Sequence, residues 1–108
     1  MNDSQKSIMI HAINHFSVDH QIDKAIEELG ELITALSRRR LDRSNRQDIA
    51  EEIADVLIMA NQLRIIYGGE MVDDFIDQKL LRLRKTINSD IDRVTRLNPE
   101  VYHRNKTD

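Results

Sequence analysis

Two acidic clusters lie inside apolar repeats of helical period, and together they limit this chain to few folds. They read Glu27-Glu28-Leu29-Gly30-Glu31 and Glu51-Glu52-Ile53-Ala54-Asp55. Like charges three and four residues apart destabilise a helix by roughly 0.2–0.5 kcal/mol per pair. Two helices that carry this cost at matched positions indicate a positive group between them.

Apolar residues spaced three and four apart predict helices over most of the chain. One Pro, three Gly, no Trp and 32% charged residues also favour helices over a sheet. We expect helices over about residues 4–16, 17–39, 44–67 and 70–88, and a short fifth helix over residues 91–97 before Pro99. Ser17 or Asp19 caps the second helix, Ser44 with Gln47 fits a capping box for the third, and Gly68-Gly69 ends the third.

The expected fold class is all-α, an antiparallel four-helix bundle with a short extra C-terminal helix. One domain is expected over residues 1–108, with a core over about 4–88 and a C-terminal extension over 89–108. The stripe expected to be buried in the second helix comprises Ile22, Ala25, Ile26, Leu29, Ile33 and Leu36. In the third helix it comprises Ile49, Ile53, Val56, Leu57, Ala60, Leu63 and Tyr67.

The two acidic clusters are placed to face each other across a helical hairpin. Short connections make neighbouring helices antiparallel, so the second and third helices should turn back near residues 41–42. Glu28 and Asp55 have their sequence midpoint at 41.5, and Glu31 and Glu52 have the same midpoint. A symmetric turn therefore sets Glu28 level with Asp55 and Glu31 level with Glu52, and four carboxylates converge between the helices.

Four converging carboxylates indicate a cation site. Ionised carboxylates at close range repel, so they bind protons unless a cation lies among them. Oxygen ligands without Cys or His favour Mg²⁺, Mn²⁺ or Ca²⁺, and Mg²⁺ commonly shares its shell with phosphate oxygens. The pattern predicts a divalent-metal site that acts on a phosphorylated substrate. The alternative is a solvated acidic helix face that holds no ion.

Several polar residues are candidates for substrate contact. Lys79 and Arg82, one turn apart, are either phosphate ligands or ordinary basic surface. Lys24, one turn before the first cluster, reaches the same cavity or pairs with Glu28. Gln62, on the same helix face as Asp55, bonds a phosphate or base or faces solvent. The arginines around the turn are expected mainly to face solvent or to pair with Asp42 and Asp48, with phosphate contact as the alternative; they are Arg38, Arg39, Arg40, Arg43 and Arg46.

Charge and hydropathy limit the cell compartment and the binding partners expected for this protein. The net charge of −3 gives no indication of nucleic-acid binding. The first five residues lack the basic region and apolar run of a signal peptide, and no apolar stretch is long enough to cross a bilayer. A soluble cytoplasmic protein is expected.

The paired acidic motif resembles the signature of a known enzyme superfamily. Glu27-Glu28-x-x-Glu31 followed by Glu52-x-x-Asp55 is similar to the motif of the all-α nucleoside triphosphate pyrophosphohydrolases, the MazG-like superfamily. Gln21-x-x-Lys24 ahead of the first cluster, Glu52-Ile-Ala-Asp55-Val-Leu-Ile in the third helix and Lys79-x-x-Arg82 in the fourth extend the resemblance. It covers about Gln21 to Arg84.

The resemblance implies an Mg²⁺-dependent hydrolase, with Mn²⁺ as a second candidate ion, that cleaves a nucleotide between its α and β phosphates. The products are a nucleoside monophosphate and pyrophosphate. By position, Glu28, Glu31, Glu52 and Asp55 correspond to metal ligands, and Glu27 and Glu51 to groups that orient the attacking water or take its proton. Lys79, Arg82 and Lys24 correspond to phosphate-binding residues, and Gln21 and Gln62 to candidate substrate contacts. A homodimer or a dimer of dimers is implied, which suits so small a bundle.

Two other readings fit the same residues. A phosphoribosyl-ATP pyrophosphatase, or one that acts on dUTP or dCTP, shares the motif, so only a substrate panel separates them. A non-catalytic helical adaptor with an acidic face for a basic partner belongs to a different class. It predicts no thermal stabilisation by Mg²⁺ and nucleotide, whereas a true site is stabilised by its ligands.

Overall fold

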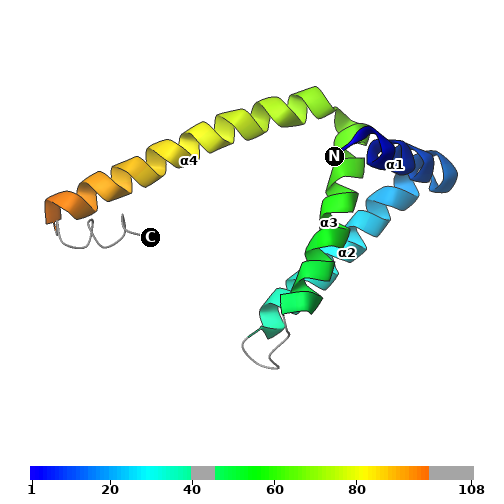
Figure 1. The fold of residues 1–108 in the computed structure, drawn as a ribbon, viewed down its shortest axis with the longest axis horizontal. Helices are drawn as coiled ribbons and strands as arrows, with labels where there is room; N and C mark the ends of the chain where they lie inside the picture. The colour runs from blue at the N-terminus through cyan, green and yellow to red at the C-terminus, as the bar shows by residue number, and fades with distance from the viewer. Residues whose placement is uncertain (40–45, 98–108) are drawn as a thin grey trace. The chain divides into compact units, whose positions relative to one another are not determined.

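The computed structural model describes residues 1–39 and 46–97 (Figure 1). Within these ranges the chain is all-helical and contains no strand. The helices are α1 (Asp3–Phe16), α2 (Val18–Arg38), α3 (Arg46–Tyr67) and α4 (Gly69–Leu97). The chain divides into two compact units, Met1–Gly69 and Glu70–Asp108.

Local capping chemistry fixes the start of α1 and of α2. Asn2 Oδ1 accepts a hydrogen bond from the Gln5 backbone N–H at 2.8 Å, and Gln5 Oε1 accepts one from the Asn2 N–H at 3.1 Å, which completes a capping box. Ser17 ends α1 and caps α2, because its Oγ accepts from the His20 N–H at 3.2 Å. Of the two caps expected for this helix, the structure uses Ser17, which has a positive φ of 98°.

A glycine ends α3, as its position predicted. Gly68 has a φ of 118°, which a side chain would strain, and its N–H donates to the Arg64 carbonyl oxygen at 2.9 Å. The predicted turn and the Ser44 cap before α3 lie outside the described residues.

The prediction of a separate fifth helix is wrong, because α4 continues without a break to Leu97. Asn88 and Ser89 are weak helix formers, but each disfavours a helix by only a few tenths of a kcal/mol relative to its neighbours. Neither Gly nor Pro interrupts residues 70–97, so the helix propagates through both. Pro99 and the C-terminal end of the chain lie outside the described residues.

In the first unit α2 and α3 lie side by side and run in opposite directions (Figure 1). Gln21 bonds Gln62, whereas Glu28, further along α2, lies near Asp55, earlier in α3. Helix α1 contacts both. The buried apolar residues are Met9, Ile13, Ala25 and Met59, and the buried polar residues are Gln21, Glu28 and Gln62. The seam between α2 and α3 is therefore largely polar.

The apolar stripe of α2 lies beside this seam and is mostly uncovered within the first unit. Ile26 is 63% exposed and Ile33 is 65% exposed, and on α3 Leu57 is 54% exposed. Of the α2 residues expected to be buried, Ala25 is buried in the unit itself. Among the described helices, none has the length and apolar character needed to span a membrane.

Candidate metal and phosphate site

Glu28 belongs to two groups of carboxylates that the α2–α3 hairpin brings together. Glu27, Glu28 and Glu31 form one group on α2, and Glu28 forms the second with Glu52 and Asp55 of α3. In each group one oxygen from every residue lies within 4.8 Å of the others. Side chains three and four residues apart share a helix face, which explains the first group, and the antiparallel pairing of α2 with α3 produces the second.

Two oxygens of this site are buried without a partner. Glu28 is only 8% exposed, and its Oε2 has no hydrogen-bond partner among the described residues. The same is true of Oε2 of the half-buried Glu52. A buried polar atom without a partner destabilises a fold by about 1–3 kcal/mol, more when it is charged. A cation site whose ligands are all carboxylates has such unsatisfied oxygens, because its oxygens can accept hydrogen bonds but cannot donate them to one another.

The neighbouring carboxylates disfavour the charged form of Glu31. Its interaction with the Glu28 carboxylate raises the pKa of Glu31 above its usual 4.5, and the negative charges of Glu28, Glu52 and Glu27 raise it further. Glu52 belongs to α3, so its charge acts on the pKa of Glu31 across the hairpin. Glu31 and Glu52 therefore lie close enough to interact, as the symmetric turn predicts. Since Glu31 is exposed, a cation from solvent has access to its carboxylate.

Lys24 supplies the positive charge that the described residues offer to Glu28. Its Nζ lies 3.2 Å from Glu28 Oε1 and 3.4 Å from Glu27 Oε1. The hydrogen bond to Glu28 and the charges of both carboxylates raise the pKa of Lys24 above 10.5. One lysine satisfies one oxygen of Glu28 and leaves the other without a partner.

A pair of buried amides closes the seam on the side of α1. Gln21 Nε2 donates to Gln62 Oε1 at 2.7 Å, and Gln62 Nε2 lies 3.7 Å from the sulfur of Met59. His20 Nδ1 lies 2.8 Å from Gln21 Oε1. These bonds join α2 to α3 directly, so the two candidate substrate contacts also hold the helices in register.

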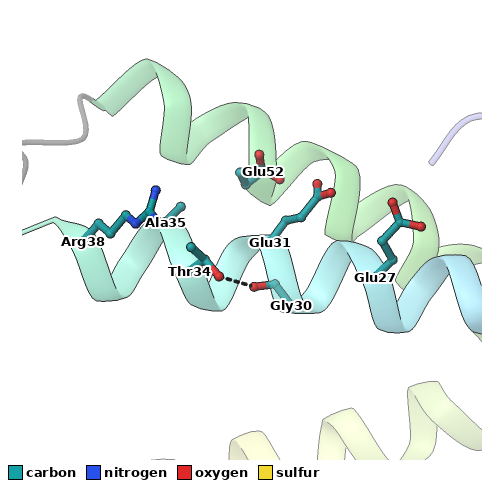
Figure 2. A pocket seen from close by; sticks show the side chains of 7 residues that line it. All are labelled: Glu27, Gly30, Glu31, Thr34, Ala35, Arg38 and Glu52. Atoms are coloured by element: carbon teal, nitrogen blue, oxygen red, sulfur yellow. Dashed lines mark hydrogen bonds between the residues drawn. The ribbon is translucent and has the colours of Figure 1, made fainter.

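An open pocket of about 520 Å³ extends from the acidic site along α2. Figure 2 shows the carboxylates of Glu27 and Glu31 rising from α2 beside Glu52 of α3, with Arg38 further along α2. Between them lie Gly30, Thr34 and Ala35, and the Thr34 hydroxyl donates to the Gly30 carbonyl oxygen at 3.0 Å. The pocket thus has an acidic end, a floor of small residues and a basic end.

The structure brings some of the predicted site residues together and leaves others apart. Glu51 is exposed and, among the described residues, belongs to neither carboxylate group. Lys79 and Arg82 are exposed residues of α4, in the second unit. The sequence predicts Arg38 mainly as solvated or ion-paired surface, with phosphate contact as the alternative; its spacing of seven residues from Glu31 indicates that the two share a helix face.

The carboxylate set fits a hard divalent cation. Each ligand atom of the two groups is a carboxylate oxygen, Glu28 and Glu52 each have a buried oxygen without a partner among the described residues, and the exposed Glu31 leaves an opening for water or substrate. Comparisons of the chain with protein-family models, with curated proteins and with solved structures found no match. The likeness to the MazG-like superfamily therefore remains an expectation from the motif.

Proposed function

We propose that this protein is an Mg²⁺-dependent nucleoside triphosphate pyrophosphohydrolase that converts an NTP or dNTP to the monophosphate and pyrophosphate. One observation carries the proposal: Glu28 joins carboxylates from both helices around buried oxygens that lack partners. The adjoining pocket has acidic and basic ends, as a metal-chelated phosphate chain requires. The motif resemblance supplies the reaction class.

In this proposal Glu28, Glu31, Glu52 and Asp55 hold the metal. When bound, Mg²⁺ polarises the phosphate oxygens and lowers the pKa of a coordinated water, with Mn²⁺ as the second candidate. Glu28 is the central ligand of the four because it is buried and belongs to both carboxylate groups. Because the pKa of Glu31 is raised, protons would compete with the cation at this ligand, so metal affinity should fall as the pH falls.

The chain's own residues then handle the proton and the phosphates. Water attacks the α-phosphorus, its oxygen forms the new P–O bond, and the bond to the bridging oxygen breaks to release pyrophosphate. Glu27 is the better-placed acceptor for the water proton, because it lines the pocket and is exposed to it. Glu51 is the second candidate for this role. Lys24 exchanges part of its pairing with Glu28 for a phosphate oxygen when substrate binds.

The proposal includes assembly into an antiparallel four-helix bundle that dimerises or forms a dimer of dimers. The uncovered apolar stripe of α2 supports it, as does α4, which has no buried residue within its own unit. Lys79 and Arg82 of α4 keep the phosphate-binding role that the motif resemblance implies. Sedimentation equilibrium measures the predicted oligomer; a monomer at micromolar concentration contradicts this part of the proposal.

The test is a panel of nucleoside triphosphates, including dUTP and dCTP, together with phosphoribosyl-ATP. Each is incubated with protein and Mg²⁺, and pyrophosphate is assayed separately from single phosphate. Glu52→Gln should lower the rate on the order of 100-fold or more, since it removes a metal ligand. Asp23→Asn, which removes an exposed α2 carboxylate outside both groups, is the matched control and should retain activity. Release of single phosphate only, or full activity in Glu52→Gln, refutes the proposal, and no thermal shift with Mg²⁺ and nucleotide favours the adaptor.

A further inference from the structure

Arg38 lies in the same pocket as the metal-site carboxylates and has no partner among residues 1–39 and 46–97. It lines the pocket with Glu31 and Glu52, and among the described residues it makes no hydrogen bond or ion pair. The neighbouring Arg39, by contrast, donates from Nη1 to the Leu36 carbonyl oxygen at 2.9 Å. An arginine that lines a pocket and has no internal partner is available for a ligand.

The pocket separates Arg38 from the acidic site by a length suited to a phosphate chain. Seven residues of helix place the Arg38 backbone about 10 Å along the axis from Glu31, and the long arginine side chain covers part of that interval. Gly30, Thr34 and Ala35 keep the floor low, and nothing lies within 4 Å of a Cβ built on Gly30. The volume of 520 Å³ falls in the usual range for small-ligand pockets, roughly 300–1,000 Å³.

We propose that Arg38 binds the distal phosphates of a metal-chelated di- or triphosphate that lies along α2, from Glu31 toward the hairpin turn. The inference rests on the proposed function and adds a direction to it: the phosphate tail points to the turn, and the nucleoside lies on the side of Gln21 and Gln62. The buried unpaired oxygens of Glu28 and Glu52 supply the independent sign of a cation at the other end. The planar guanidinium suits this role because it bonds a phosphate through two N–H groups at once.

A purely structural role for Arg38 makes a different prediction. A cation in the last turn of a helix stabilises it through the helix dipole, and this benefit does not depend on any ligand. Arg38→Lys keeps that charge but loses the two-pronged geometry. The test therefore compares Arg38→Met, Arg38→Lys and the control Arg39→Met, after thermal unfolding has shown that each is folded.

The experiment is calorimetric titration, in the presence of Mg²⁺, with inorganic triphosphate, with pyrophosphate and with a nucleoside monophosphate. Arg38→Met should weaken triphosphate and pyrophosphate binding about tenfold or more, as loss of a charge-assisted bond does. Arg38→Lys should fall between it and wild type, and Arg39→Met should stay within about twofold of wild type, as a surface change does. Affinity for the monophosphate, which has no distal phosphate, should be unchanged in all three.

Equal triphosphate affinity in Arg38→Met and Arg39→Met overturns the inference, as does an equal loss for triphosphate and monophosphate. The two proposals fail separately. Arg38-dependent triphosphate binding without pyrophosphate release from any nucleotide keeps the Arg38 subsite and removes the hydrolase. Pyrophosphate release by wild type, together with an unchanged KM in Arg38→Met, keeps the hydrolase and removes the subsite.

Discussion

Replacing Glu52 by Gln should stabilise the metal-free protein while removing its response to Mg²⁺. An oxygen of Glu52 lies within 4.8 Å of oxygens of Glu28 and Asp55. Two unit charges at that distance repel by about 3 kcal/mol at an effective dielectric constant of ~20. Solvent around the exposed Asp55 and the nearby Lys24 reduce the sum, so we expect a net gain of about 1–3 kcal/mol. The new amide also offers N–H donors beside the unpaired Oε2 of Glu28.

The assay is thermal unfolding in chelator and in Mg²⁺. For a domain of this size the gain raises the Tm by about 5–15 °C in chelator. If the proposed site binds Mg²⁺, the ion at 100 times its Kd should stabilise wild type by about 2.7 kcal/mol and leave Glu52→Gln unchanged, so the difference in stability between the two proteins should shrink or reverse. Glu51→Gln makes the same charge change one residue away, at an exposed position outside both carboxylate groups, and should keep both the wild-type Tm and the Mg²⁺ shift. A Glu52→Gln protein less stable than wild type in chelator, or one that Mg²⁺ still stabilises, refutes the reasoning.

Three further changes probe the surroundings of the site. Because the pKa of Glu31 is raised above 4.5, the contribution of Glu31 to metal-free stability is complete below pH 4.5 and is lost as the pH rises through the raised pKa. The urea-unfolding free energy of wild type minus that of Glu31→Gln should therefore fall as the pH rises over this window. A difference that rises contradicts the prediction. Gln62→Leu should destabilise the fold by about 1–3 kcal/mol, since the buried Nε2 of Gln21 loses its acceptor. Adding Gln21→Leu should recover part of this loss in a double-mutant cycle, and simple additivity would show that the pair is not coupled. Ser17→Ala should lower the free energy of unfolding by about 1–2 kcal/mol, because α2 loses its cap. Ser17→Gly should lower it by only about a few tenths of a kcal/mol, because glycine accepts the φ of 98°. Equal Tm values for the two variants would exclude backbone strain at this position.

The facing arrangement of the acidic residues followed from the sequence because a helical hairpin has few degrees of freedom. Helical period fixed which residues share a face, and the shared midpoint paired Glu28 with Asp55 across the turn. The ends at Ser17 and Gly68 followed from backbone chemistry. The break expected after Asn88 was wrong, because weak propensity at two positions does not outweigh continuous helical hydrogen bonding.

Which face of α2 meets α3 could not be read from periodicity, since α2 carries two adjacent faces that each repeat at helical spacing. Apolar burial favours the face of Ile26 and Ile33, yet the hairpin buries Gln21, Ala25 and Glu28 against α3. A polar seam is stable only where its groups are satisfied. The amide at Gln21 finds a partner in Gln62, whereas the second oxygen of Glu28 finds none. The packing that left the apolar face free within this unit therefore also placed inside the hairpin a Glu28 oxygen that has no partner among the described residues, and the proposed dication would supply that partner without any change of fold.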